Sequence, residues 1–404
     1  MDLAADSISH RNGQLPISLD IKVNFVTAKD LSLETKIITL WSDFDPLAKE
    51  WNVLLQRSCS NTIFLTWEWL QTWREVTQEA AKPFVVTVRD ENGRLVGAAP
   101  FYVSELRLLK VLRFRTLRMM ADYATGSEYA DWIVDPNMDK AVLSAIADAL
   151  LAAKSDWDTI WMPRIAGWTG AMERIKAACK EKGLLHHSRT TIFSYFDLPV
   201  SMKLYEESFS PKHRQQMRRK RRKLLNTEGV EVVLCEKPED LPRFIETLFE
   251  LHYRRWQLEG QEGTFRRKPY EAEFYRQFSR IALKNDWLWL MALTDHGEIK
   301  SIQIGYVYDG VFLQLQEGFD PDYAQGSGNV LRTEVIERCI DAGLSGYDFL
   351  GGGSEHKRRW GAQERDGYDL SIGHPSKLKT KLLFLYEIWP SGRFFEEIGL
   401  LGGV

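Results

Sequence analysis

"LQEGFDPDYAQGSGNVLRTEVIERCIDAG", from Leu315 to Gly343, carries the two signals on which the fold assignment depends. Its first residues read as the end of a β-strand, and the residues after Gly328 have the apolar spacing of a helix. Glycines 326 and 328 stand at the joint and remove side chains there. A helix N-terminus offers unpaired N–H groups and a partial positive charge, so the joint suits phosphate oxygens. An ordinary helix cap by Ser327 or Asn329 is the alternative interpretation.

The stretch that follows, "YDFLGGGSEHKRRWGAQ" from Tyr347 to Gln363, repeats this arrangement in another form. A short apolar strand runs into three glycines and then into a group of cations. Ligands of open α/β sheets gather at the ends of strands, and a lysine there can offset negative charge on a reacting oxygen. A surface loop with solvated cations is the competing interpretation.

Earlier in the chain the same succession of elements occurs a first time. Asn92-Gly93 and His296-Gly297 each join two β-rich runs, which is a strong hairpin signal. "MALTDHGEIKSIQIGYV" in the second half echoes "VTVRDENGRLVGAAPFYV" in the first. We also expect a strand over 128–134, and a strand over 368–373 that closes the sheet. The pattern predicts a diverged internal duplication, with two unrelated α/β domains as the alternative.

The 404 residues are too many for a single core. We predict a flexible tail over 1–33 and a first domain over 34–198. A second domain over 199–375 contains a basic helix at 210–227, and a helical tail covers 376–404.

Composition narrows the class of protein. Hydrophobic residues make up 44% of the chain and charged residues 27%, as in ordinary soluble globular proteins. The four cysteines lie far apart without a CxxC pair, which argues against a zinc site and suits a reducing cytoplasm. We find no signal peptide and no apolar run of the length that spans a membrane, about 20 residues. The sequence therefore predicts a cytoplasmic protein without a metal.

"SPKHRQQMRRKRRKLL", from Ser210 to Leu225, contains eight cations. The formal net charge is −3, so the rest of the chain without these eight carries −11. A concentrated basic element on an acidic protein argues against broad nucleic-acid binding. Three interpretations stay open: the helix lines the approach of a phosphorylated donor or acceptor, it binds tRNA, or it is a solvated face that contacts anionic lipid headgroups.

Four further residues are candidates on chemical grounds. His252 shares a predicted helix face with Arg255 and Trp256 and can accept a proton from an acceptor, although a packed histidine is the alternative. Arg255 suits a carboxylate or phosphate of the acceptor. Glu317 stands near a strand end, and Asp348 lies in an apolar run, where a buried acid needs a partner.

Together, "LHYRRW", the helix after "GFDPDYAQGSG", and "YDFLGGG" followed by "HKRRWGA" resemble the GNAT-related acyltransferases of the CelD type. These are known as cellulose or exopolysaccharide biosynthesis acetyltransferases and are distant relatives of the FemAB peptidyltransferases. The basic helix also resembles the helix that opens the conserved domain of that family. The resemblance is clearest over 194–362, and over 35–197 it rests on "FLTWEWLQTW".

This resemblance implies an α/β (α+β) fold of tandem GNAT-like domains, each with a mixed, largely antiparallel sheet flanked by helices. It implies transfer from acetyl-CoA or another acyl-CoA to an amine or hydroxyl of a cell-envelope or exopolysaccharide precursor. The pyrophosphate of CoA would sit at a compressed form of the usual GNAT loop, formed here by Gln325, Gly326, Ser327, Gly328 and Asn329. In the FemAB relatives, which use aminoacyl-tRNA, a lysine lies near the reacting carbonyl, and Lys357 matches it.

The predicted catalytic residues are thus Lys357, His252, Asp348 and Glu317. The predicted substrate-binding residues are Arg255, Trp256, Arg214, Arg218, Arg358 and Trp360. We expect a small-molecule or sugar-linked acceptor. Two other functions remain as alternatives: a FemAB-like, aminoacyl-tRNA-dependent transferase acting on a peptidoglycan precursor, and a non-catalytic scaffold that binds anions.

Overall fold

The computed structural model describes residues 32–77, 80–108, 112–122 and 125–385. The tail predicted for 1–33 lies outside these residues apart from its last two positions. The helical tail predicted for 376–404 is described as far as residue 385, where helix α13 (Leu378–Leu385) ends.

The first half of the chain begins with strand β1, continues with helices and then forms a hairpin. Thr66 caps α3, since its hydroxyl accepts a hydrogen bond from the Trp69 amide. The elements are β1 (Glu34–Ile38), α1 (Trp41–Phe44), α2 (Ala48–Arg57), α3 (Trp67–Val76), β2 (Lys82–Arg89), β3 (Leu95–Leu108), β4 (Leu112–Met119), β5 (Ile133–Val134), α4 (Asp139–Ala152), β6 (Thr159–Ala166), α5 (Ala171–Glu181) and β7 (Leu185–Asp197).

The second half repeats this order after two additional helices. Gly93 and Gly297 turn the two hairpins with positive φ angles of 76° and 81°, so both hairpin predictions are confirmed. The elements are α6 (Met202–Glu207), α7 (Pro211–Leu225), β8 (Val230–Leu234), α8 (Leu241–Gln257), α9 (Thr264–Arg267), α10 (Pro269–Lys284), β9 (Leu288–Asp295), β10 (Glu298–Tyr308), β11 (Val311–Phe319), α11 (Ser327–Asp341), β12 (Gly346–Gly351), α12 (Glu355–Arg358) and β13 (Gln363–Gly373).

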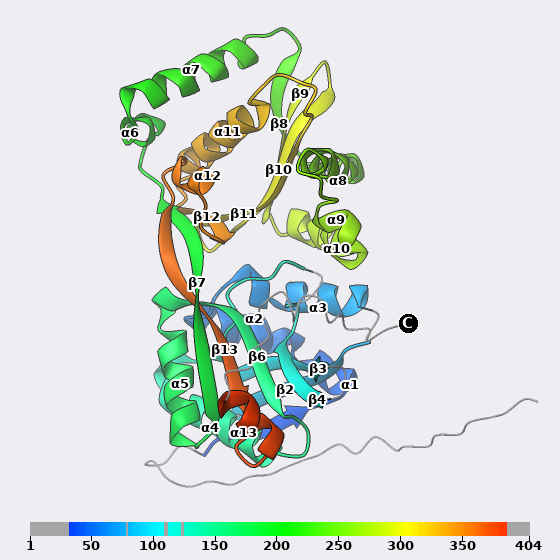
Figure 1. Cartoon of the computed structure of the whole chain (residues 1–404), viewed down its shortest axis with the longest axis vertical. Coiled ribbons are helices and arrows are strands. Elements are labelled where there is room, and N and C mark those ends of the chain that lie inside the picture. Colours follow the sequence, from blue (N-terminus) through cyan, green and yellow to red (C-terminus); the bar gives the residue numbers. More distant parts are fainter. Residues whose placement is uncertain (1–31, 78–79, 109–111, 123–124, 386–404) are drawn as a thin grey trace, which may run out of the picture.

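One continuous sheet joins the halves, in the order β1-β2-β3-β4-β6-β13-β7-β12-β11-β10-β9-β8. From either edge the pattern is the same: four antiparallel strands, a fifth parallel to the fourth, and a sixth that comes from the other half. Strands β7 and β13 are therefore exchanged, and Figure 1 shows them crossing between the halves. The two halves repeat one architecture, as the sequence predicted.

Two strand predictions are wrong in their details. The strand expected to close the sheet at 368–373 is part of β13, which lies in the middle of the sheet between β6 and β7. The strand expected over 128–134 is reduced to Ile133–Val134. Its earlier residues leave the strand conformation because Tyr129 has a φ of 59° and the buried carboxylates of Glu128 and Asp131 need polar partners.

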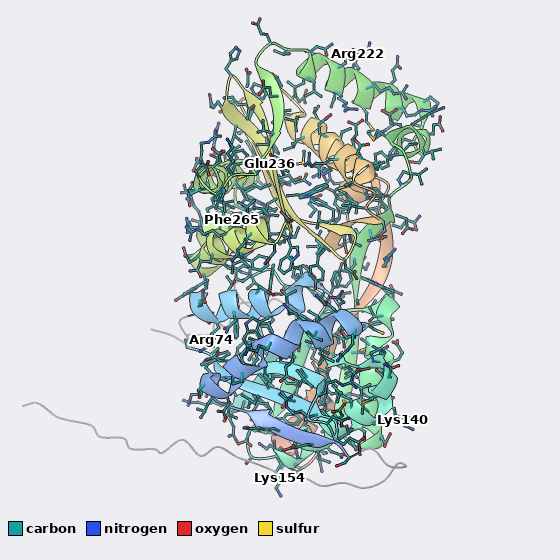
Figure 2. All side chains as sticks on the ribbon, turned by 180° about the vertical axis from the view of Figure 1, so that it is seen from behind. Arg74, Lys140, Lys154, Arg222, Glu236 and Phe265 are labelled. Atoms are coloured by element: carbon teal, nitrogen blue, oxygen red, sulfur yellow. The ribbon has the colours of Figure 1, made fainter. Side chains whose placement is uncertain are left out.

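The hydrophobic core also passes from one half to the other. Trp69 of α3 packs edge-on against Phe274 and Phe278 of α10, with ring centroids 4.7 and 4.6 Å apart. A second cluster of buried residues lies under α6, α7 and α11. Figure 1 shows α11 on one face of the second half's sheet and α8 and α10 on the other. In Figure 2, Arg222 of α7 lies at one end of the molecule and Lys140 and Lys154 lie near the opposite end.

The helices among the described residues lack the length and hydrophobicity of a membrane-spanning segment.

Candidate active site

The site begins where β11 and β12 separate. These parallel strands pair only between Val311–Leu313 and Gly346–Asp348, and beyond that point each pairs with its other neighbour. The register between β10 and β11 shifts at Leu315, which forms a bulge. Leu315 lines a cavity of about 720 Å³ that is walled by residues of both halves. The splayed strands therefore open into a cleft between the halves.

A second cavity, of about 510 Å³, runs along the start of α11. Its lining includes all five residues of the predicted cofactor loop, 325–329. Gly326 precedes the helix with a φ of 89°, a conformation that favours glycine. Lys220 of α7 reaches over this loop, so that a Cβ placed on Gly326 would lie 3.3 Å from Lys220 Nζ. The helix N-terminus and one lysine thus face the same cavity, as an anion site requires.

The two cavities meet at Glu317, Arg332, His356 and Arg255, which line both. Arg332 is almost fully buried; it donates hydrogen bonds to the Glu317 carboxylate and, at 2.7 Å, to His356 Nε2. Burial opposes ionisation of Glu317, but Arg332 and Arg255 outweigh it and hold the pKa of Glu317 below its ordinary value. Burial and the neighbouring Arg332 lower the pKa of His356, so its imidazole is neutral at pH 7. The junction is a fixed network of charges.

Lys357 closes the end of β12. Its Nζ donates to the backbone carbonyls of Phe349, Leu350, Gly351 and Gly352 at 2.9, 3.3, 2.7 and 2.8 Å. Burial lowers the pKa of this lysine. Lys357 also lines the cleft, so it holds the glycine-rich strand end in place beside the space that a substrate would enter.

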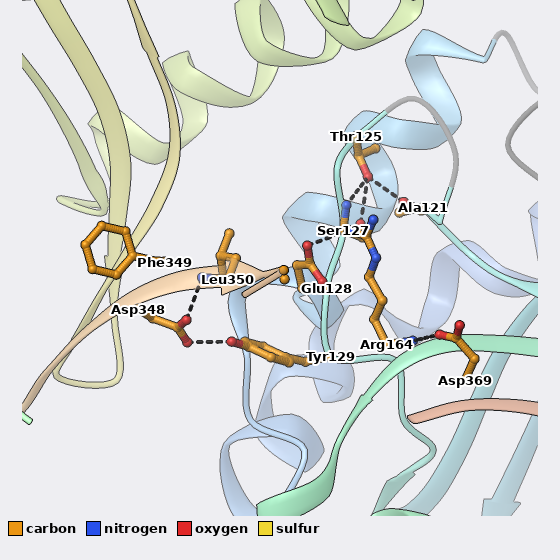
Figure 3. A network of polar contacts seen from close by, with 12 residues as sticks. Ala121, Thr125, Ser127, Glu128, Tyr129, Arg164, Asp348, Phe349, Leu350 and Asp369 are labelled. Carbon is orange, nitrogen blue, oxygen red and sulfur yellow. Dashed lines mark hydrogen bonds and ion pairs between the residues drawn. The ribbon is translucent and has the colours of Figure 1, made fainter. Parts of the chain in front are cut away.

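Asp348 connects the two halves. Its Oδ2 accepts a hydrogen bond from the Tyr129 hydroxyl at 2.5 Å, and its Oδ1 accepts from the Leu350 amide at 2.7 Å (Figure 3). Leu350 and Tyr129 both have positive φ angles, 60° and 59°. Burial raises the pKa of Asp348 to about 6, although the hydrogen bond from Tyr129 opposes this rise.

Glu128 extends from the first half into the cleft. Its Oε1 accepts from Arg164 at 2.5 Å, whereas Oε2 is buried and has no hydrogen-bond partner among the described residues (Figure 3). A Cβ on Gly351 would come within 3.0 Å of Oε1, so this carboxylate lies against the end of β12. Burial raises the pKa of Glu128, and Arg164, Lys357 and the nearby backbone N–H of Gly351 only partly offset that effect. A buried carboxylate oxygen without a partner needs a donor from elsewhere.

The structure places His252 and Arg358, two of the remaining predicted residues, outside the charge network that joins the two cavities. His252 is 2% exposed, accepts from Trp256 Nε1 at 2.9 Å, and lines neither the cleft nor the cavity along the start of α11. Burial lowers the pKa of His252 to about 4. Arg358 is paired with Glu355 and Glu364.

The predicted cations of α7 lie apart from the cleft. Arg214 and Arg218 line an open hollow on the outer side of α7, and Arg218 is paired with Glu206. Trp360 lines a third cavity, of about 410 Å³, between α7, α11 and α12. The guanidinium of Arg332 lies 5.1 Å from the centre of the Trp360 ring.

Sequence reasoning missed Arg332, His356, Glu128 and Tyr129 as site residues. Arg332 did carry a signal, because it interrupts the apolar face formed by Val330, Leu331, Val335 and Ile336. A cation at such a position requires an acidic partner nearby. No comparable local signal marks Glu128 or Tyr129, whose neighbours in the site come from the other half of the chain.

A family model matches the larger part of the second half. Residues 211–358 match the family model described as "Acetyltransferase (GNAT) domain". No curated protein matches the chain by sequence.

Similar solved structures cover nearly the whole chain. One is described as FemX, with 13% identity, a TM-score of 0.57, and coverage of 88% of this chain and 100% of that one. A second is the C-terminal domain of a putative lysylphosphatidylglycerol synthetase from Agrobacterium fabrum, at 11% identity and a TM-score of 0.49, covering 85% and 96%. A third is a tandem GNAT protein from the clavulanic acid pathway, at 14% identity and a TM-score of 0.41, covering 84% and 98%. At these identities a likeness concerns the fold alone. The chain has a tandem GNAT-like fold of the predicted class, and its second half contains a GNAT-type acetyltransferase domain.

Proposed function

We propose that this chain is an acyltransferase that moves an acyl group from acyl-CoA, such as acetyl-CoA, directly to an amine or hydroxyl of an acceptor held between its halves. One observation carries the proposal: the cavity along 325–329 joins the cleft through the four residues that line both. A donor with a diphosphate at one end and a reactive carbonyl at the other fits such a connected pair of cavities.

The donor would bind with its pyrophosphate at the start of α11. The helix dipole, the glycine joint and the ammonium of Lys220 all favour negative charge there. From that end, the separation between β11 and β12 leads toward the cleft. The thioester carbonyl would then lie near the bulge at Leu315 and the strand end that Lys357 holds.

The acceptor would be polar and would enter the cleft. Buried carboxyl groups of Asp122, Glu128 and Glu271 line its wall, and burial raises the pKa of each. Such a wall suits an acceptor that donates hydrogen bonds, and an amine best of all. A sugar-linked precursor of the cell envelope or of an exopolysaccharide has the required chemistry, and the resemblance to CelD-type transferases suggests this class.

The reaction would proceed without a covalent enzyme intermediate. The acceptor nitrogen or oxygen gives up a proton to Glu128 Oε2 and forms a bond to the acyl carbon. The carbon–sulfur bond breaks with its electron pair on sulfur, and the CoA thiolate leaves and takes up the proton that Glu128 accepted, so the carboxylate is restored. Glu317, held ionised by Arg332 and Arg255, positions these guanidinium groups rather than accepting protons. Lys357 either contributes charge near the carbonyl oxygen or fixes the strand end beside it.

Donor binding distinguishes this function from its main alternative. We expect CoA to raise the melting temperature, because a ligand at about 100 times its Kd adds about 2.7 kcal/mol to the free energy of unfolding. An aminoacyl-tRNA-dependent transferase would ignore CoA and be stabilised by charged tRNA. Stabilisation by charged tRNA alone would therefore replace the proposal with that alternative. If an RNA homopolymer stabilised the chain as well as CoA did and no thioester were consumed, the scaffold interpretation would hold.

A further inference from the structure

The outward cations of α7 form a surface that the proposed acyl transfer does not use. Helical spacing places Arg214, Arg218 and Arg222 in one row, with Arg219 and Lys223 beside it. Lys220 instead faces the start of α11. The helix thus has an inner side that serves the donor cavity and an outer side that is almost purely cationic.

These outer cations are largely uncompensated. Among the described residues, Arg214, Arg219, Arg222 and Lys223 form no ion pair, whereas Arg218 is paired with Glu206. Like charges four residues apart destabilise a helix. An isolated row of this kind is thus unfavourable in water, and an opposite charge lying over it would remove the repulsion.

Exposed aliphatic side chains accompany the cations. Val200, just before α6, is 89% exposed, and Leu204 of α6 is 47% exposed. Lys203 and Glu207 of α6 share the wall of the open hollow with the α7 cations, so the two helices form one face. We name the surface formed by Val200, Leu204 and the outer cations of α7 the basic end face.

We propose that the basic end face docks on the surface of an anionic lipid bilayer, with the cations at the headgroups and Val200 and Leu204 in the interfacial layer. Leu204 lies between the helical positions of Lys203 and Glu207 on the exposed side of α6, and cations next to exposed apolar groups favour binding to such surfaces. The formal net charge is −3, so the chain without the five outer cations of α7 carries −8, and the attraction to an anionic bilayer is concentrated at this end.

Nucleic acid fits this surface less well. Single-stranded nucleic acid is held by aromatic side chains on which bases stack, and the exposed apolar groups here are aliphatic. The α7 cations lie at one end of the molecule, where Figure 2 labels Arg222. A nucleic acid longer than α7 would therefore either leave the protein surface or run along the acidic remainder of the chain. A bilayer contacts the end face alone.

Co-sedimentation of the full chain with lipid vesicles tests the proposal. The protein should bind vesicles that contain phosphatidylglycerol and remain free of vesicles of pure phosphatidylcholine, and salt should weaken the binding. The double variant Arg219→Glu/Arg222→Glu should lower the partition coefficient at least about 25-fold, since each cation near an anionic surface contributes about 5-fold. The matched double variant Lys140→Glu/Lys154→Glu changes the net charge equally at the other end of the molecule and should change the partition much less.

A variant without the exposed aliphatic side chains, and a comparison with RNA binding, distinguish a lipid surface from a nucleic acid. Val200→Ser/Leu204→Ser should weaken vesicle binding several-fold without altering its dependence on phosphatidylglycerol. Equal losses in the two charge-reversal variants would overturn the proposal, because they would reflect net charge rather than this face. Tight binding of RNA that depends on Arg219 and Arg222, together with indifference to phosphatidylglycerol, would overturn it in favour of a nucleic acid. CoA stabilisation of the same variants is a separate readout that reports on the transferase proposal.

Discussion

At the scale of single residues, Glu128 is the side chain that we propose as the proton acceptor. Its buried Oε2 has no partner among the described residues and its pKa is raised by burial. As a proton acceptor it must be ionised, so we expect activity to rise with pH through this raised pKa. Glu128→Gln should lower kcat about 100-fold or more and abolish that acidic limb of the pH profile, since a general base contributes 10²–10⁴-fold.

CoA binding supplies the control for this variant. Glu128 lies in the cleft and away from the loop at 325–329, so the Kd for CoA should stay within about 3-fold of the wild-type value, roughly 0.6 kcal/mol. The exposed Glu173→Gln on α5 should leave both activity and affinity unchanged. A pH profile of Glu128→Gln that keeps its acidic limb would assign the proton to another group.

Asp348 gives a prediction about stability and pH. Burial raises its pKa from 3.8 to about 6, so between these pH values the folded state binds more protons than the unfolded state. The free energy of unfolding therefore falls as pH rises through this window, by up to about 3 kcal/mol. Asp348→Asn removes the titration and keeps the shape, so from pH 4 to pH 7 the variant should gain stability relative to wild type by about 2–3 kcal/mol.

Urea denaturation at the two pH values measures this change. Tyr129→Phe is the companion variant, because it removes the hydroxyl that bonds Asp348 across the halves but leaves the carboxyl in place. It should lower the free energy of unfolding by about 1–2 kcal/mol. It should also enlarge the stability that the protein loses when Asp348 ionises, because the Tyr129 hydroxyl favours the ionised carboxylate. A difference between Asp348→Asn and wild type that did not change with pH would show that Asp348 keeps an ordinary pKa.

At the scale of elements, the two sides of α7 should behave differently. Lys220 lies over the start of α11, whereas Lys223 points to the outer side of the same helix. Lys220→Glu should weaken CoA about 10- to 100-fold, or about 1.4–2.8 kcal/mol, because it places a negative charge beside the expected pyrophosphate. Lys223→Glu makes the same change of charge and should alter the affinity less than about 2-fold.

Titration calorimetry at low and physiological salt checks both variants. The difference between them should shrink as salt rises, since screening acts on the partly exposed Lys220. Equal effects of the two substitutions would mean that the overall potential of α7, and not contact at the helix start, attracts the donor.

Elements also show how far sequence alone reaches in this protein. The hairpins at Gly93 and Gly297 and the helix expected after Gly328 were predictable, because each depends on neighbouring residues and their local geometry. The hydrogen bond from Tyr129 to Asp348 spans 219 positions, and no local pattern encodes it. The same limit explains the misplaced strand at 368–373, whose partners β6 and β7 belong to the first half.

At the scale of the whole molecule, the exchange of β7 and β13 determines how the protein unfolds. β13 pairs with β7 along its entire length and also with β6, while β7 pairs with β12. Neither half contains all the neighbours of its own strands. We therefore expect a single calorimetric transition for the whole chain, with equal calorimetric and van't Hoff enthalpies.

Cutting the chain at the boundary proposed between residues 198 and 199 tests whether either half folds without the other. Fragment 1–198 keeps β7 but lacks β12 and β13, and fragment 199–404 leaves β12 without β7. Each fragment alone should lack a cooperative melting transition, whereas the two together should reassemble and regain binding of CoA. The matched control is the uncut chain, which differs from the mixture of fragments only by the peptide bond between residues 198 and 199. A cooperative transition in fragment 199–404 alone would show that a GNAT-like half can fill the place of the exchanged strand by itself, and the cleft would then form by docking of two finished domains instead of by folding.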